Sequence, residues 1–135
     1  MKNKVQAIIY KKEQGKKKYL ILHRKLNWVG WELMKETMEE NESFEETLRR
    51  GIKEEIGVEK ITIENEKKVD IELPAGKIIY VYVVRISPQE KIDITKEKEH
   101  DKLKWVSQEE AEKLLTYKNA VNMLKEFKDQ DLKVQ

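Results

Sequence analysis

Two adjacent carboxylates, Glu54 and Glu55, occur in the segment LRRGIKEEIGV at residues 48–58, with Arg50 four positions before the first of them. On a helix, residues three and four apart share a face, so Arg50 and Gly51 would lie beside the pair. Hard cations such as Mg²⁺ prefer oxygen ligands, and an arginine can hold a carboxylate in place by a bidentate hydrogen bond. The same spacing also suits an ordinary charged helix face. A divalent-metal site and a solvated acidic surface are both open at this point.

The segment that carries these residues has the signals of a helix with a defined start and end. Ser43 and Glu46 form a capping-box pattern, and Gly57 is typical of a helix C-terminus. Between them, apolar residues recur at every fourth position: Phe44, Leu48, Ile52 and Ile56. The pattern predicts a helix over Ser43–Ile56 with one apolar stripe facing a core.

Apolar runs on both sides of this helix predict strands. KVQAIIY and KKYLILHR predict a hairpin, and NWVGWELM predicts a further strand followed by a polar loop, KETMEENES. ITIENEKKVDIEL and GKIIYVYVVRIS predict two long strands around PAG. The second of them is almost entirely apolar, which is typical of a central strand covered on both faces.

The C-terminal third predicts a charged loop, a short strand and two helices. The loop is EKIDITKEKEHDK, the strand is LKWVS, and the helices are QEEAEKLL, capped by Ser107, and NAVNMLKEF. The polar tail KDQDLKVQ is expected to fray. The element order predicts a single domain over residues 1–135 of the mixed α/β class.

Composition restricts the function classes. Hydrophobic residues make up 39% and charged residues 40% of the chain, its net charge is +2, and it has no cysteine. A nearly balanced charge does not call for nucleic acid as a partner, and the lack of cysteine excludes disulfides and thiolate metal sites. No apolar run approaches the ~20 residues of a membrane span, and no signal peptide is evident. These features predict a cytoplasmic protein with no membrane partner.

The stretch from Trp31 to Val58 resembles the Nudix box, G-x5-E-x7-R-E-U-x-E-E-x-G-U, in which U is aliphatic. Two of its positions depart from the pattern: Glu36 replaces the first glycine, and Gly51 replaces the glutamate after the arginine. WELMKE also resembles the W-x-L-P-K-G lead-in of the branch that cleaves diadenosine polyphosphates, and EHDKLKWVSQEEAEKLLTYK resembles the end of such proteins. The positions that match the box are Glu42, Arg50, Ile52, Glu54, Glu55, Gly57 and Val58.

The resemblance implies a Nudix-like α/β/α sandwich with a mixed sheet. It also implies hydrolysis of a small-molecule nucleotide, a nucleoside diphosphate linked to another group, with Mg²⁺ or Mn²⁺. Position by position, Arg50 matches the arginine that orients the metal-binding glutamates. The implied metal ligands or base are Glu54, Glu55 and Glu99.

The resemblance further implies residues near the nucleotide: Lys35, Tyr117 and Lys118. Tyr82, with Tyr80 on the same strand face, is a candidate to stack on a base. Because strand neighbours two apart share a face, both tyrosines could equally be buried. His100 is expected to belong to the connection between the charged loop and the strand rather than to act as a base.

The two departures leave two hypotheses open. Glu36 could bring a carboxylate into the space left by Gly51 and complete the metal site of an active hydrolase. Alternatively, the changes mark a module that has lost catalysis and binds a nucleotide, an RNA end or a protein. In a damaged hydrolase Gly51→Glu would raise the rate over Gly51→Ala, whereas it would lower the rate if Glu36 already occupies that space.

Overall fold

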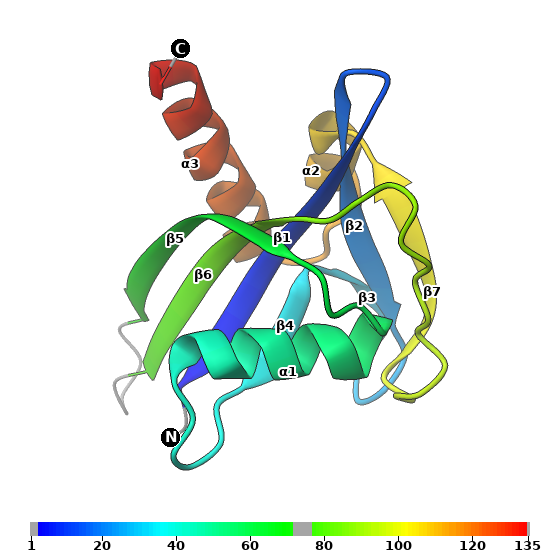
Figure 1. Ribbon diagram of the computed structural model, residues 1–135, viewed down its shortest axis with the longest axis vertical. Coiled ribbons are helices and arrows are strands. Elements are labelled where there is room, and N and C mark those ends of the chain that lie inside the picture. Colours follow the sequence, from blue (N-terminus) through cyan, green and yellow to red (C-terminus); the bar gives the residue numbers. More distant parts are fainter. Residues whose placement is uncertain (1–2, 72–76, 135) are drawn as a thin grey trace.

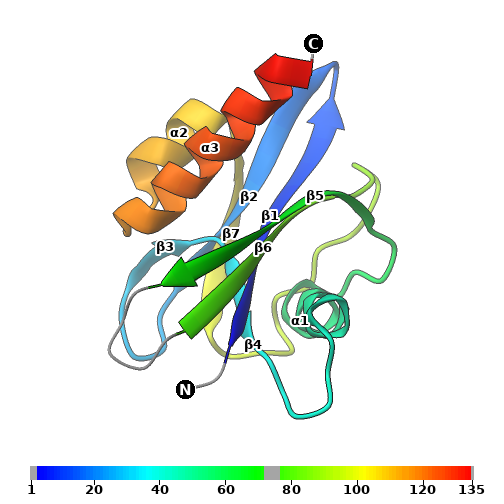
Figure 2. The ribbon, with the colours of Figure 1, turned by 90° about the vertical axis from the view of Figure 1, so that its left-hand side faces the viewer.

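A mixed sheet forms the middle of three layers, with helix α1 on one face and helices α2 and α3 on the other (Figures 1 and 2). The computed structural model describes residues 3–71 and 77–134. The predicted α/β/α sandwich is confirmed. The elements are β1 (Lys4–Glu13), β2 (Lys16–Arg24), β3 (Gly30–Glu32), β4 (Met34–Thr37), α1 (Phe44–Ile56), β5 (Thr62–Ile71), β6 (Lys77–Arg85), β7 (His100–Val106), α2 (Gln108–Leu114) and α3 (Lys118–Val134).

The sheet is built around a parallel pair. Its strand order is β3-β2-β1-β6-β5, in which β1 and β6 are parallel and the other neighbours antiparallel. Strand β4 pairs with the N-terminal half of β1, and β7 pairs with β2. The prediction that β6 is central and covered on both faces is confirmed, since Val81 and Val84 are both 0% exposed and belong to clusters on opposite faces.

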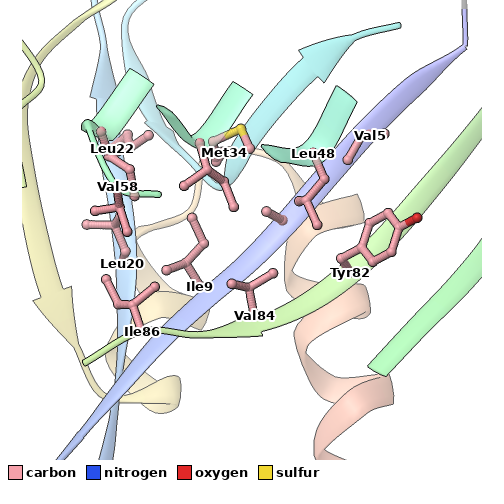
Figure 3. Packing of buried hydrophobic residues seen from close by; sticks show 13 residues of the cluster. Val5, Ile9, Leu20, Leu22, Met34, Leu48, Val58, Tyr82, Val84 and Ile86 are labelled. Carbon is pink, nitrogen blue, oxygen red and sulfur yellow. The ribbon is translucent and has the colours of Figure 1, made fainter. Parts of the chain in front are cut away.

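Each face of the sheet carries its own apolar cluster. The cluster under α1 contains Leu48, Ile52 and Ile56 from the helix, and Figure 3 shows Leu48 together with strand residues such as Ile9 and Val84. The cluster under α2 and α3 contains Leu124 of α3 and Leu33 of the β3–β4 segment. Helix α1 is therefore anchored along its full length, which fixes where its polar residues point.

The ends of α1 are as predicted. The side chain of Ser43 accepts a hydrogen bond from the backbone N–H of Glu46, and the backbone N–H of Ser43 donates one to the carboxylate of Glu46. Gly57 ends the helix with φ +72°, a left-handed conformation that glycine adopts without strain. These caps satisfy backbone groups at both ends of α1.

The predicted strand over residues 27–34 is wrong in its extent. Two short strands replace it, β3 paired with β2 and β4 paired with β1. Because β4 continues to Thr37 through its pairing with β1, the polar loop starts later than predicted and Glu36 lies on a strand. The choice of a strand partner is a long-range event that a local pattern does not reveal.

The C-terminal third differs from prediction at its boundaries. Strand β7 begins at His100 rather than Leu103, and α3 continues to Val134 through the segment predicted to fray. Both predicted helices are present, and Ser107 forms a capping box with Glu110. The predicted turn at PAG lies outside the described residues. No helix in the described part of the chain is long and apolar enough to cross a membrane.

Candidate active site

The adjacent carboxylates of α1 lie in different surroundings. The side chain of Glu54 is 45% exposed and accepts a hydrogen bond from Nη1 of Arg50 at 3.3 Å. Glu55 is only 3% exposed. Its Oε2 is buried and is the one buried side-chain polar atom without a hydrogen-bond partner among the described residues. An unpartnered buried carboxyl oxygen is costly, which calls for a functional explanation.

Glu55 faces two residues from the start of β7. One ligand atom each from Glu55, Glu99 and His100 lie within 4.8 Å of one another. The backbone carbonyl of Glu99 accepts a hydrogen bond from the backbone N–H of Lys25, which ties this segment to the end of β2. Burial, with repulsion from Glu99 and from Glu36, raises the pKa of Glu55 to about 10. A bound cation would reverse this effect by favouring the ionised carboxylate.

Arg50 holds the acidic residues around α1 in place. Its Nε and Nη2 donate to both carboxylate oxygens of Glu42, at 2.6 and 2.9 Å, and Nη2 also donates to the carbonyl of Thr37 at 2.9 Å. This pairing lowers the pKa of Glu42 to about 2. The remaining nitrogen, Nη1, lies 3.3 Å from Glu54 and 3.5 Å from Glu36. Arg50 thus contacts Glu54, one of the two adjacent carboxylates that it was expected to orient.

Sequence reasoning missed Glu32, which joins the acidic cluster to its surroundings. Glu32 is 8% exposed, and its Oε2 lies 2.7 Å from Nε2 of His100 and 3.2 Å from Nη1 of Arg24. Burial opposes ionisation, but these two hydrogen bonds keep the pKa of Glu32 below its ordinary value. A carboxylate inside the aromatic run NWVGWELM was the available signal, because charged residues are rarely buried without a partner.

A pocket of about 530 Å³ lies between the sheet and α3. It brings together the predicted residues Lys35 and Tyr117, with Trp31 and Glu32 beside them. Burial lowers the pKa of Lys35, although the nearby charge of Glu32 opposes this shift. Since Glu32 lines the pocket and also contacts His100, the pocket is connected to the acidic cluster by one hydrogen bond.

Two predicted nucleotide-binding residues do not line this pocket. Lys118 follows Tyr117 as the first residue of α3 but is not part of the lining. Tyr82 lies on the opposite face of the sheet, in the α1 cluster, where it is 4% exposed (Figure 3). Its ring centroid is 5.1 Å from that of Tyr80, which stacks in turn on Phe44. The structure therefore places Tyr82 in the core, which was the alternative to base stacking for this strand face.

The donors at the acidic cluster fit a divalent cation. Glu55 offers an unpartnered oxygen, and Glu99 offers a second carboxylate beside it. Carboxylate oxygens suit Mg²⁺ and Mn²⁺. His100 is held by the carboxylate of Glu32, an arrangement often found around metal centres. Fold and site together define an α/β/α protein with a buried acidic cluster suited to a metal ion.

Comparison with known proteins agrees with this class. Residues 2–127 match the NUDIX domain, so the chain belongs to the Nudix family. An Ap4A hydrolase from C. elegans is 22% identical, with a TM-score of 0.82 and 96% of each chain covered. The NUDIX domain of Shewanella oneidensis NrtR, solved with ADP ribose, is 15% identical, with a TM-score of 0.75, and covers 96% of this chain and 88% of its own.

A third similar structure, the Nudix hydrolase RenU from M. smegmatis, is 12% identical with a TM-score of 0.83, covering 99% of this chain and 88% of its own. A search of curated proteins found no match. At these identities the structural matches establish the fold, while the match over residues 2–127 establishes the family.

Proposed function

We propose that this protein is a metal-dependent pyrophosphohydrolase that cleaves a nucleoside diphosphate-linked substrate, with a dinucleoside polyphosphate as the first candidate. The observation that carries the proposal is the buried, unpartnered Oε2 of Glu55 beside Glu99 and His100. A protein gains nothing in stability from such a group, so its retention points to a ligand that pairs with it. Family membership supports the same reaction class.

In this proposal Glu54, Glu55 and Glu99 would hold Mg²⁺ or Mn²⁺. When bound, the cation would neutralise charge on the phosphates and lower the pKa of an attacking water. Arg50 fixes the orientation of Glu54 through Nη1 while its other nitrogens remain on Glu42. The chain thus supplies a prearranged set of acidic ligands at one end of α1.

The pocket beneath α3 would bind the nucleotide. Lys35 supplies a positive charge for phosphate oxygens, and Tyr117 is 54% exposed at the rim with its ring edge-to-face to Trp28. Aromatic rings offer a face on which a base can stack. Because Glu32 contacts both pocket and cluster, a nucleotide in the pocket would direct its phosphates toward Glu99 and Glu55. The ADP ribose in NrtR and the substrate named for the C. elegans enzyme are consistent with this ligand class.

The test is a phosphate-release screen of dinucleoside polyphosphates, nucleotide sugars and nucleoside triphosphates with Mg²⁺ or Mn²⁺. Hydrolysis by the wild type and its loss in Glu55→Gln are expected. Glu59→Gln is the matched control, since Glu59 is an exposed acidic residue paired only with Lys53 among the ion pairs of the described residues. Absence of hydrolysis across the whole screen would contradict the proposal.

A binding module is the second candidate, favoured by the pocket itself, which could hold a nucleotide without any metal chemistry. This function predicts nucleotide binding by a wild-type protein that hydrolyses nothing. Calorimetry with ADP distinguishes the two candidates when it is run on the protein used for the screen. Binding without turnover supports the module, and turnover that depends on Glu55 supports the enzyme.

A further inference from the structure

Gly51 lies in the middle of α1 and has no conformational need to be glycine. Among the described residues, the glycines with positive φ are Gly15 and Gly57. A glycine in ordinary helical conformation weakens a helix relative to alanine, because the unfolded chain is freer. A reason for Gly51 must therefore come from its surroundings.

The surroundings show why no side chain fits at this position. A Cβ built on Gly51 would lie 2.9 Å from Cβ and 3.0 Å from Cγ of Glu36, and 3.4 Å from Cε of Met34. The atoms of Glu36 that approach most closely are those nearest its backbone, which cannot swing away as the end of a flexible side chain can. Glu36 thus fills the space that a residue at position 51 would need.

Strand pairing fixes Glu36 in that place. Strand β4 pairs with β1 in the register Val5↔Glu36, and Val5 is fully buried. Met34 and Glu36 are two residues apart, so they project from the same face of β4, the face that contacts α1. Glu36 therefore approaches the helix from the sheet, at the height of Gly51.

The carboxylate of Glu36 ends beside Arg50, the residue that also holds Glu54. Its Oε1 accepts a hydrogen bond from the backbone N–H of Thr37 at 3.0 Å and lies 3.5 Å from Nη1 of Arg50. The same nitrogen holds Glu54. Glu36 and Glu54 thus share one nitrogen of Arg50. Glu55, the residue after Glu54, carries the unpartnered buried oxygen.

We infer that positions 36 and 51 have exchanged roles: Glu36 supplies from strand β4 the carboxylate that an intact box supplies from the helix, and Gly51 provides the space for it. The inference rests on the metal site of the proposed function. On this inference the Nudix box of this chain keeps its full number of carboxylates, with one of them moved from the helix to strand β4. Gly51→Glu would then crowd the site instead of restoring it.

The first experiment measures Mn²⁺ affinity by calorimetry, with thermal denaturation in EDTA to confirm that each variant is folded. Glu36→Gln and Glu55→Gln are each expected to weaken binding about tenfold or more. Glu39→Gln is the matched control, because Glu39 also lies near Nη1 of Arg50, at 3.7 Å, but its side chain is 64% exposed. Its affinity should equal that of the wild type.

The possible outcomes distinguish a failure of the exchange between positions 36 and 51 from a failure of the proposed metal site. If Glu36→Gln binds Mn²⁺ as the wild type does while Glu55→Gln does not, the exchange is wrong and the metal site stands. If the wild type binds no Mn²⁺, both fail. A loss in Glu36→Gln that also appears in Glu39→Gln overturns the exchange, since it would show a general effect of charge near Arg50.

The second experiment tests the exchange directly with the double variant Glu36→Gly, Gly51→Glu. We expect each single variant to bind Mn²⁺ more weakly than the wild type, and the double variant to recover affinity to within about threefold, because contacting residues are not additive. In parallel, Gly51→Ala should lower the melting temperature of the wild type and raise that of Glu36→Gly. A double variant that binds no better than the singles, or an equal effect of Gly51→Ala in both backgrounds, overturns the exchange.

Discussion

Arg50 contacts several of the acidic residues around α1. Its planar group contacts Glu42 with two nitrogens and reaches Glu54 and Glu36 with the third. A lysine could not reproduce this arrangement, because an ammonium group has no fixed fork of donors. Glu42 matches the family pattern in sequence, and the structure shows its use, which is to hold Arg50 rather than to face Glu55 and Glu99.

The Glu42–Arg50 pair predicts a specific pH dependence of stability. Since Arg50 lowers the pKa of Glu42 to about 2 from its ordinary value of 4.5, the pair stabilises the fold fully above pH 4.5. This contribution is lost as the pH falls from 4.5 toward 2. We expect Glu42→Gln to lower the melting temperature at pH 7 and the difference from wild type to shrink between pH 4.5 and 2.5.

Thermal denaturation over that pH range measures the effect. Glu59→Gln serves as the control, because its ion pair with Lys53 is exposed and contributes little. A difference between Glu42→Gln and wild type that stays constant down to pH 2.5 would show that the ionisation of Glu42 is not coupled to folding.

At the scale of elements, local sequence signals predicted the ends of α1 correctly. The extents of β3 and β4 were not predicted, because they depend on long-range strand pairing. The caps at Ser43 and Gly57 and the four-residue apolar period all lie within the helix itself, so a reader of the sequence has the whole signal. The break between β3 and β4 depends on which strand each one pairs with, and those partners lie elsewhere in the chain. Glu36 was expected in a loop for this reason.

The capping box of α1 predicts a measurable contribution to stability. Ser43→Ala removes the acceptor for the backbone N–H of Glu46, 3.1 Å away, and should cost about 1 kcal/mol of unfolding free energy. Ser43→Gly should cost less, because glycine leaves the helix end open to water. Urea denaturation of the three proteins checks the order. An unchanged stability of Ser43→Ala would show that the hydrogen bond between Ser43 and Glu46 does not stabilise the helix.

At the scale of the whole molecule, the sheet separates the apolar cluster under α1 from the pocket next to α3. The period of two in β6 places Tyr80 and Tyr82 on one face, but it does not say whether that face is core or site. Helix α1 covers the face that carries both tyrosines, and α2 and α3 cover the other face (Figure 2). The pocket with Lys35 and Tyr117 is lined in part by residues of α3 and so lies on that other face. Lys35 and Tyr117, which were expected from motif matches, line one pocket, whereas Lys118, from the same match as Tyr117, does not. Tyr82, which no motif supported, lies in the core.

The two tyrosines should therefore differ in what their loss changes. Tyr82→Ala empties a buried position and should cost about 3 kcal/mol of unfolding free energy, with no selective loss of nucleotide affinity. Tyr117→Ala removes a half-exposed ring and should leave stability nearly unchanged while weakening ADP binding about fivefold. Urea denaturation and calorimetry on both variants test this. If Tyr117→Ala binds ADP as tightly as the wild type does, the pocket is not the nucleotide site.

The contact between Glu36 and Gly51 constrains the order in which a chain could pass between the two arrangements. A chain with side chains at both positions must move atoms that now lie 2.9 Å from a Cβ at position 51, whereas a chain with glycine at both has no overlap. A chain that starts with glycine at position 36 and glutamate at position 51 can therefore pass through an intermediate with glycine at both positions. Position 51, on the helix, changes first, and position 36 changes second. The two positions are thus epistatic, and a pattern search that scores them one at a time counts a single compensated exchange as two independent losses.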